Sequence, residues 1–265
     1  MSGRPFRLVL RCPRRNGQHG QNSPSCSASG YLILSPRLIL FDIDGTLVAS
    51  NLAGRRVMSQ ALHDIFGNDG MLQTTSFAGK TDQSIIYAAM SAVGVPEPEL
   101  LGALPLIYKA MEKNGQHTFS EESLVPCTGV LPLLAELRAN PQVILGLQTA
   151  NIRSTALQKL LSAGLDPAWF MVGAFGCESP TREGLFPIAW QRARQLTEHH
   201  FSGHNTVVVG DTPGDVMAAR SKGALVLAVA SGFSEYSELA RCEPDYLVAD
   251  LSETETIMSF LLGNR

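Results

Sequence analysis

Leu38-Ile39-Leu40-Phe41-Asp42-Ile43-Asp44-Gly45-Thr46-Leu47 joins an apolar run to two carboxylates and a Gly-Thr turn. The run before Asp42 has the length and composition of a strand that is buried on both faces. Side chains two residues apart on an extended chain point to the same side, so Asp42 and Asp44 should project together beyond the carboxyl end of this strand. Open α/β sheets bind ligands there, and adjacent carboxylates need a cation, a proton or a substrate between them. The stretch therefore predicts a hard metal ion with nucleophilic or acid-base chemistry.

A turn or a calcium loop is the alternative interpretation of the same residues. Aspartate and glycine are common in turns, and the pattern Asp-x-Asp-Gly also opens calcium loops. A calcium loop needs further oxygen ligands in order and a glutamate at its last position. The continuation Thr46-Leu47-Val48-Ala49-Ser50-Asn51-Leu52-Ala53 does not supply that set. We therefore favour the catalytic interpretation.

From Gly129 onward, predicted strands alternate with predicted helices. Apolar runs typical of strands occur at 143–147, 170–175, 206–210, 225–229 and 246–248, and apolar residues at helical spacing occur at 130–137, 152–161, 187–196, 216–222 and 253–262. This alternation is typical of a parallel sheet with helices on both faces. We predict an α/β fold with a Rossmann-like parallel sheet core.

The stretch from 49 to 126 has a different pattern. Apolar residues recur at helical spacing near 57–66, 85–93 and 101–111, and no strand is predicted among them. We predict a helical insertion directly after the first strand. Residues 36–48 and 127–265 would then form the α/β core, and residues 49–126 a second domain.

Polar side chains follow three of the predicted strands: Asp42 and Asp44 the first, Thr149 and Asn151 the strand at 143–147, and Asp211 and Asp215 the strand at 206–210. The carboxyl ends of parallel strands lie at one edge of the sheet, so these side chains should converge. The helix after Thr149 offers free N–H groups to an anion. Four carboxylates near an anion site require a cation. We predict Mg²⁺, which binds few carboxylates and keeps waters for substrate oxygens.

The ordered motifs resemble those of the haloacid dehalogenase superfamily: Asp42-x-Asp44-Gly45-Thr46, then Thr149, then Gly210-Asp211-x-x-x-Asp215. Three segments are similar to those of its phosphoglycolate-phosphatase-like members: Leu147-Gln148-Thr149-Ala150-Asn151, Gly173-Ala174-Phe175-Gly176 and Val209-Gly210-Asp211-Thr212-Pro213. Those members carry a helical cap inserted after the first motif. The resemblance covers the chain from about Pro36 to its end, and it implies that residues 49–126 are such a cap.

The resemblance also implies a Mg²⁺-dependent phosphatase that hydrolyses a small phosphate monoester through an aspartyl-phosphate intermediate. Asp42 would be the nucleophile and a metal ligand. Asp44 would protonate the leaving alcohol and then activate water, while its backbone carbonyl reaches the metal. Thr149 would hold a phosphate oxygen. Asp211 would be the second carboxylate on Mg²⁺, and Asp215 would support the metal from behind.

The sequence departs from the family pattern at the third motif, which supplies a positive charge for the phosphate. The third motif is usually a lysine that bridges the nucleophile and the phosphate. The five lysines are Lys80, Lys109, Lys113, Lys159 and Lys222, and none lies between the strand near 170–175 and the helix near 187–196. Arg182 does, and a guanidinium can hold phosphate with two donors, so we assign it the lysine's role. Asn151 is expected to bind substrate as well, and Lys80 to face a second anionic group from the cap.

Other activities of the same superfamily are the alternatives. A phosphomutase or phosphotransferase uses the same core, and the sequence does not separate it from a phosphatase. A metal-independent 2-haloacid dehalogenase usually lacks the second carboxylate of the first motif, and Asp44 is present. A non-catalytic binding protein would be expected to have lost a carboxylate, and all four are retained.

Composition limits the class of partner. The formal net charge is −3, which gives no electrostatic case for nucleic acid, and no apolar run approaches the length of a membrane span. The five cysteines are scattered and form no C-x-x-C pair, which favours a reducing compartment. We expect a cytoplasmic enzyme whose partner is a small phosphorylated metabolite, with neither nucleic acid nor a membrane as partner. The sequence leaves the oligomeric state open.

Residues 1–35 differ from the rest of the chain. They contain Arg4, Arg7, Arg11, Arg14 and Arg15, and the first acidic residue of the chain is Asp42. We predict a disordered N-terminal extension, in which the apolar run 31–34 could add an edge strand. Leaders rich in arginine and serine are also typical of organelle transit peptides, an alternative that we do not favour.

Overall fold

A six-stranded parallel sheet forms the core of the part of the chain that the structure describes. The computed structural model describes residues 36–77, 79–122 and 124–263. The predictions for residues 1–35, including the strand at 31–34, lie outside these ranges. The strands are β1 (Arg37–Phe41), β4 (Val143–Thr149), β5 (Val172–Phe175), β6 (Thr206–Gly210), β7 (Leu225–Val229) and β8 (Tyr246–Val248), in the spatial order β5-β4-β1-β6-β7-β8. The predicted α/β fold is confirmed.

Helices cover both faces of this sheet. Alternate residues of β1 point to opposite faces, so Leu38 and Leu40 join one buried cluster while Ile39 and Phe41 join the other. The face of Ile39 and Phe41 packs against α4 (Val130–Ala139), α5 (Arg153–Ser162) and α9 (Thr254–Leu262). The opposite face packs against α6 (Leu185–Thr197), α7 (Pro213–Ser221) and α8 (Tyr236–Arg241). Because the strands are buried on both faces, their sequences are continuous apolar runs and do not alternate between apolar and polar residues.

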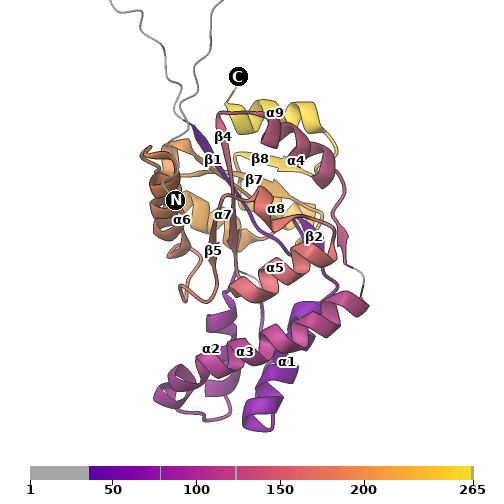
Figure 1. Cartoon of the computed structure of the whole chain (residues 1–265), viewed down its shortest axis with the longest axis vertical. Coiled ribbons are helices and arrows are strands. Elements are labelled where there is room, and N and C mark those ends of the chain that lie inside the picture. The colour runs from indigo at the N-terminus through magenta and orange to yellow at the C-terminus, as the bar shows by residue number, and fades with distance from the viewer. Residues whose placement is uncertain (1–35, 78, 123, 264–265) are drawn as a thin grey trace, which may run out of the picture. The chain divides into compact units, whose positions relative to one another are not determined.

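Three helices are inserted between the first strand and the rest of the sheet: α1 (Ala53–Phe66), α2 (Asp82–Ser91) and α3 (Glu97–Glu121). We call them the inserted helices. Figure 1 shows them together at one end of the sheet, next to α5. The prediction that residues 49–126 contain no strand is wrong at both borders. β2 (Val48–Ala49) pairs antiparallel with β3 (Val125–Pro126), and two-residue strands are too short to show an alternating pattern.

Helix ends differ from prediction where local capping decides them. α7 begins at Pro213, three residues before the predicted start at 216, because Thr212 and Asp215 form a capping box. α3 extends well beyond the predicted 101–111 and carries Pro105 on its exposed side. The short helix α8 was not predicted, and single 3₁₀ turns occur at η1 (Pro167–Trp169) and η2 (Gly203–Asn205).

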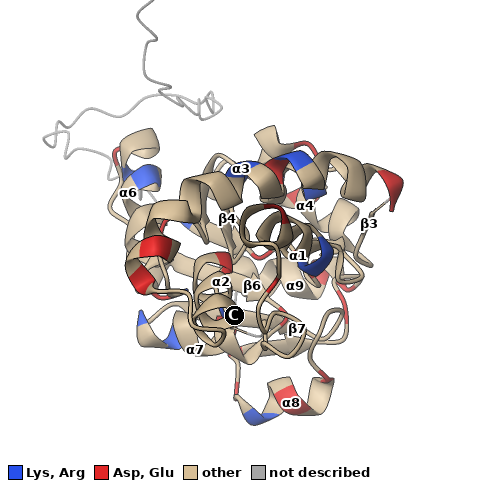
Figure 2. Ribbon diagram, turned by 90° about the horizontal axis from the view of Figure 1, so that it is seen from below, with Lys and Arg blue, Asp and Glu red and all other residues tan. Residues whose placement is uncertain are grey.

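Charge is mixed over the surface of the inserted helices. Figure 2 shows basic and acidic segments interspersed on the face that it presents. Among the described residues, no helix is both long and apolar enough for a transmembrane span.

Candidate active site

Three carboxylates meet beyond the carboxyl ends of β1 and β6. Asp42 follows β1, Asp211 follows β6, and Asp215 lies in the first turn of α7. One oxygen of each residue lies within 4.8 Å of the others, and all three residues are buried. β1 and β6 are neighbours in the parallel sheet, which brings these distant parts of the chain to one edge. The structure therefore places Asp42, Asp211 and Asp215 together as the sequence predicts. The Asp44 carboxylate is not part of this cluster.

The turn after β1 fixes the position of the Asp211 carboxylate. Gly45 has a φ of +76°, and a Cβ at this position would collide with the Asp211 carboxylate. Thr46 Oγ1 donates to Asp211 Oδ1 at 3.4 Å, and the backbone N–H of Phe233 donates to Asp211 Oδ2 at 2.8 Å. Only glycine combines this conformation with such a close approach. The Gly-Thr pair of the first motif thus positions a carboxylate of the last one.

Arg182 brings a positive charge into the cluster. It lies in the loop between β5 and α6, yet its side chain is only 6% exposed. Its Nη2 donates to Asp42 Oδ2 at 2.9 Å, and its Nη1 donates to Asp215 Oδ1. Its Nε–H is buried without a partner among the described residues. The guanidinium is therefore fixed between Asp42 and Asp215, and its Nε–H remains unpaired among the described residues.

One guanidinium does not balance three carboxylates. Burial raises the pKa of Asp215 to about 6, and the nearby Asp42 carboxylate acts in the same direction against Arg182. Burial also raises the pKa of Asp211 well above its usual range, with Asp215 and Asp42 adding to the effect. Both shifts mean that the site favours added positive charge. The donor set consists of carboxylate oxygens, which are the ligands of hard divalent cations, so these residues fit Mg²⁺.

Thr149 and Asn151 lie where β4 ends. Thr149 is fully buried, and its Oγ1 accepts hydrogen bonds from the Asn151 backbone N–H at 3.3 Å and from Asn151 Nδ2 at 2.8 Å. A hydroxyl has one donor and two acceptor sites. Both acceptor sites of Thr149 are used, so its hydroxyl proton is available to another group. The predicted contact with a phosphate oxygen stays a prediction, because Thr149 is not among the residues that line the cavity described below.

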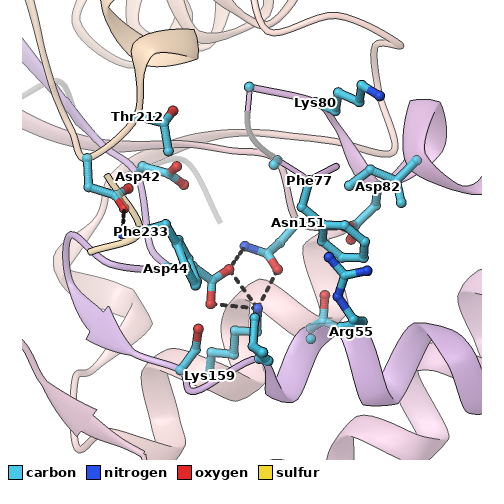
Figure 3. A pocket seen from close by; sticks show the side chains of 18 of the residues that line it. Asp42, Asp44, Arg55, Phe77, Lys80, Asp82, Asn151, Lys159, Thr212 and Phe233 are labelled. Atoms are coloured by element: carbon cyan, nitrogen blue, oxygen red, sulfur yellow. Dashed lines mark hydrogen bonds and ion pairs between the residues drawn. The ribbon is translucent and has the colours of Figure 1, made fainter. Parts of the chain in front are cut away.

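Lys159 is a site residue that the sequence analysis did not identify. It lies on α5 and is 2% exposed. Its Nζ donates to Asp44 Oδ1 at 2.8 Å, to Asp44 Oδ2 at 2.7 Å and to Asn151 Oδ1 at 2.7 Å, as Figure 3 shows. Asn151 Nδ2 donates to Asp44 Oδ2 at 2.7 Å, which closes a triangle of three side chains. Burial alone would raise the pKa of Asp44, but the Lys159 ammonium outweighs it and holds that pKa below its usual range.

Asp82 joins the inserted helices to the loop after β4. It is the first residue of α2 and is 7% exposed. Its backbone N–H donates to Ala150 O at 2.9 Å, and its Oδ2 accepts from the Ile152 N–H at 2.8 Å. Burial raises the pKa of Asp82 to about 6; Asp44 and Asp42 add to this rise, and Lys159 opposes it. The sequence signal was an N-cap threonine followed by aspartate, which indicates only a helix start.

A cavity of about 280 Å³ lies between the core and the inserted helices. The core lines it with Asp42, Asp44, Lys159 and Arg182, and the inserted stretch lines it with Arg55, Phe77, Lys80 and Met111, among others. The Arg55 guanidinium stacks 4.0 Å from the Phe77 ring centroid, and its Nη1 and Nη2 donate to backbone carbonyls of the inserted stretch. Lys80 is half-buried, and Figure 3 shows it across the pocket from Asp44.

Comparison with known proteins assigns the family. Residues 39–229 match the family described as Haloacid dehalogenase-like hydrolase. The chain is 25% identical over 229 residues to a phosphoglycolate phosphatase of Vibrio cholerae, and the alignment covers 82% of this chain and 94% of that protein. It is 23% identical over 221 residues to the pyrophosphatase PpaX of Bacillus pumilus, and the alignment covers 83% of this chain and 95% of that protein.

Solved structures share the fold. A predicted phosphatase from Clostridium acetobutylicum aligns with a TM-score of 0.63 at 19% identity, over 85% of this chain and 99% of that one. CbbY from Rhodobacter sphaeroides, in complex with phosphate, aligns with a TM-score of 0.61 at 18% identity, over 82% of this chain and 96% of that one. The chain belongs to the haloacid dehalogenase-like hydrolases, and the family predicted from the motifs is confirmed.

Proposed function

We propose that this protein is a Mg²⁺-dependent phosphatase that hydrolyses a small phosphate monoester, with Asp42 as the nucleophile. The observation that carries the proposal is the position of Arg182, whose guanidinium donates to both Asp42 and Asp215 inside a cluster of buried carboxylates. A phosphate dianion can approach a carboxylate nucleophile only where fixed positive charge offsets the repulsion. Two relatives named for phosphatase and pyrophosphatase activity support the same class of reaction.

The reaction would take two steps. An Asp42 oxygen attacks phosphorus, the phosphorus–oxygen bond to the alcohol breaks, and the leaving oxygen keeps the electron pair and takes the Asp44 carboxyl proton. Water then attacks the phosphorus of the aspartyl phosphate and gives a proton to the Asp44 carboxylate, and Asp42 leaves as a carboxylate. One water is consumed, and alcohol and inorganic phosphate are released.

The resting form of Asp44 decides where the first proton comes from. Lys159 holds the pKa of Asp44 low, so the free site contains the carboxylate, which is the form that accepts a proton from water. A phosphate monoester loses its second proton near pH 6, so its monoanion carries one proton more than the dianion. We propose that the substrate monoanion brings this proton to Asp44 and that the phosphate product takes it away.

The remaining site residues have proposed roles in binding. Asp42 and Asp211 would hold Mg²⁺, with the Asp44 carbonyl beside them and Asp215 supporting the set. The ion would supply charge neutralisation at the transferring phosphoryl group. Arg182 would orient the phosphoryl group with the N–H groups that its two carboxylate contacts leave free, and the Thr149 hydroxyl would donate to a phosphate oxygen.

We propose that residues 49–126 act as a cap that selects the substrate. The cavity that they share with the core and the Asp82 contacts with the loop after β4 support this role. Lys80 would meet a second anionic group of the substrate. The Asn151 amide is already bonded to Asp44, Thr149 and Lys159, so we propose that it orients these groups and meets the substrate only at the cavity wall.

A screen of phosphate monoesters tests the proposal by release of inorganic phosphate in Mg²⁺. The panel should include phosphoglycolate, sugar phosphates and nucleotides. Asp42→Asn removes the anionic nucleophile at constant size, so turnover should fall by orders of magnitude. Asp64→Asn, at an exposed position of α1, is the matched control. Undiminished hydrolysis by Asp42→Asn contradicts the nucleophile, and full activity in excess chelator contradicts the metal. Transfer of phosphate to an alcohol in preference to water would identify a phosphotransferase.

A further inference from the structure

We propose that Lys159 is a positioning residue, which fixes the Asp44 carboxylate for proton transfer and ties its placement to the inserted helices. The proposal rests on the phosphatase function proposed above. It goes further because Lys159 belongs to none of the motifs that carry the family resemblance. It is drawn from a buried lysine whose polar contacts are all with two site residues.

The number of donors decides what Lys159 acts on. An ammonium has three N–H donors and no acceptor. The structure gives the Lys159 Nζ three acceptors at 2.7–2.8 Å, two on Asp44 and one on Asn151. With every donor engaged, the ammonium has none left for a substrate oxygen. Lys159 therefore acts through Asp44, and the substrate is held by other groups.

The contacts restrict the rotation of the Asp44 carboxylate. Both of its oxygens are bonded to Lys159, and Oδ2 also accepts from Asn151 Nδ2. Rotation away from this position breaks hydrogen bonds to a charged donor, which are the stronger kind. Proton transfer needs the carboxyl oxygen within hydrogen-bond reach of the leaving oxygen and later of the water. A misplacement of about 1 Å costs on the order of a hundredfold in rate.

The inserted helices confine the Lys159 ammonium. Gly54 lies in the first turn of α1, and a Cβ at this position would stand 2.9 Å from Lys159 Nζ. Phe119 on α3 places its ring centroid 5.5 Å from the same atom, within the range of a cation–π contact. The amino group thus lies where α1 and α3 meet α5. The position of α1 and α3 therefore limits where the ammonium can lie, and its hydrogen bonds carry that limit to Asp44.

A double-mutant cycle between Lys159→Met and Asp44→Asn tests the proposal. The substrate is para-nitrophenyl phosphate, whose leaving group needs no proton, so that only the water-activating step depends on Asp44. The slow residual turnover of the Asp44→Asn protein is then measured at high enzyme concentration over long incubations. In the wild-type background, Lys159→Met should lower kcat by on the order of a hundredfold and leave KM within about threefold. In the Asp44→Asn background the same substitution should change kcat by less than about threefold, because the group it positions is absent. Lys113→Met, at an exposed position of α3, is the control and should match wild type.

A binding measurement separates positioning from substrate contact. Isothermal titration of inorganic phosphate in Mg²⁺ should give the same affinity for wild type and for Lys159→Met. A tenfold loss of phosphate affinity would assign Lys159 to the substrate and overturn the proposal. An equal loss of kcat in both backgrounds, or no loss in either, would overturn it too. If wild type itself releases no phosphate from any ester, the proposed function fails, and that result is distinct from these.

Gly54→Ala provides a second route should Lys159→Met not fold. The substitution keeps the lysine, displaces its ammonium, and favours the helix by up to about 1 kcal/mol. The variant should remain folded by circular dichroism while kcat falls in the wild-type background and stays level in the Asp44→Asn background. Lys159→Arg retains the charge and should recover part of the kcat lost in Lys159→Met. Wild-type kcat in Gly54→Ala would show that the inserted helices do not set the position of Asp44.

Discussion

Replacing Arg182 with alanine should destabilise the fold as well as slow catalysis. Its loop position alone would predict an intact fold, since an exposed loop residue adds little packing. The structure instead buries the side chain and pairs it with Asp42 and Asp215. Removing it leaves those two carboxylates and Asp211 without a fixed counter-charge. Breaking a buried ion pair by removing one partner costs about 3–5 kcal/mol. At roughly 2–4 °C of Tm per kcal/mol for a domain of this size, the metal-free Arg182→Ala protein should melt about 6–20 °C lower.

The catalytic cost has a separate origin. Arg182 is the fixed cation that touches Asp42, the proposed nucleophile, and loss of a charged group that stabilises a transition state costs roughly two or more powers of ten in kcat/KM. Arg182→Lys keeps the charge but loses the two-donor geometry, so it should recover part of both losses. Mg²⁺ should also restore part of the stability of Arg182→Ala, because it neutralises the same carboxylates.

Thermal unfolding by circular dichroism, with and without Mg²⁺, measures the first effect, and steady-state kinetics measures the second. Arg56→Ala is the matched control, because Arg56 pairs with Glu122 at 52% exposure and such pairs contribute at most about 1 kcal/mol. A Tm for Arg182→Ala no lower than that of Arg56→Ala would refute the argument from burial. Near wild-type kcat/KM for Arg182→Ala, with Lys80→Ala crippled, would place the required cation in the inserted helices.

Three further predictions concern charge. In the metal-free protein, folding raises the pKa of Asp82 from 3.8 to about 6. Between these two pKa values the folded state keeps a proton that the unfolded chain has lost. The free energy of unfolding should therefore fall by about 3 kcal/mol as the pH rises from roughly 4 to 6. Asp82→Asn should remove this part of the slope in urea unfolding, and identical slopes would contradict it. Burial favours protonation of Asp211 and Asp215, so protons compete with Mg²⁺ for these carboxylates. Mg²⁺ should therefore raise Tm more at about pH 8 than at about pH 5. An equal rise at both pH values would show that the two carboxylates are ionised over this whole range. Lys80→Ala should raise KM for esters with a second anionic group and leave KM for neutral alkyl phosphates unchanged, and a uniform rise would remove Lys80 from specificity.

The sheet and its carboxylate cluster are predictable because parallel topology carries most of the information. Once β1 and β6 are recognised as buried strands, the positions of Asp42 and Asp211 at a common edge follow from the shared direction of the strands. The arginine in the loop after β5 could be assigned from the family resemblance. Its burial could not, because loop residues leave no periodic pattern from which burial can be inferred. β2 and β3 were missed for the related reason that two residues define no period.

Lys159 was missed because its partners are distant in the sequence. It lies 115 residues from Asp44, and only the packing of α5 against the inserted helices shows where its amino group points. One signal was available. Lys159 shares a face of α5 with Thr155, Ala156 and Leu160, all buried, so a lysine occupied the apolar side of an amphipathic helix. Such a lysine more often buries only its aliphatic chain and keeps its ammonium in water. The pattern alone does not distinguish that arrangement from a fully buried lysine.

The loop after β4 connects the inserted helices to the chemistry from two sides. On one side, Asp82 bonds the loop backbone at Ala150 and Ile152; on the other, Asn151 bonds Asp44 and Lys159. Movement of α2 away from the core would break the Asp82 bonds and release the N–H of Ile152, at the residue next to Asn151. Movement of α1 or α3 would remove Gly54 or Phe119 from beside the ammonium that holds Asp44. A domain that merely covered the cavity would change substrate access alone. Because of these contacts, its displacement should also disorder the Asp44 carboxylate, which we propose transfers the proton, so substrate choice and the rate of the chemical step should change together.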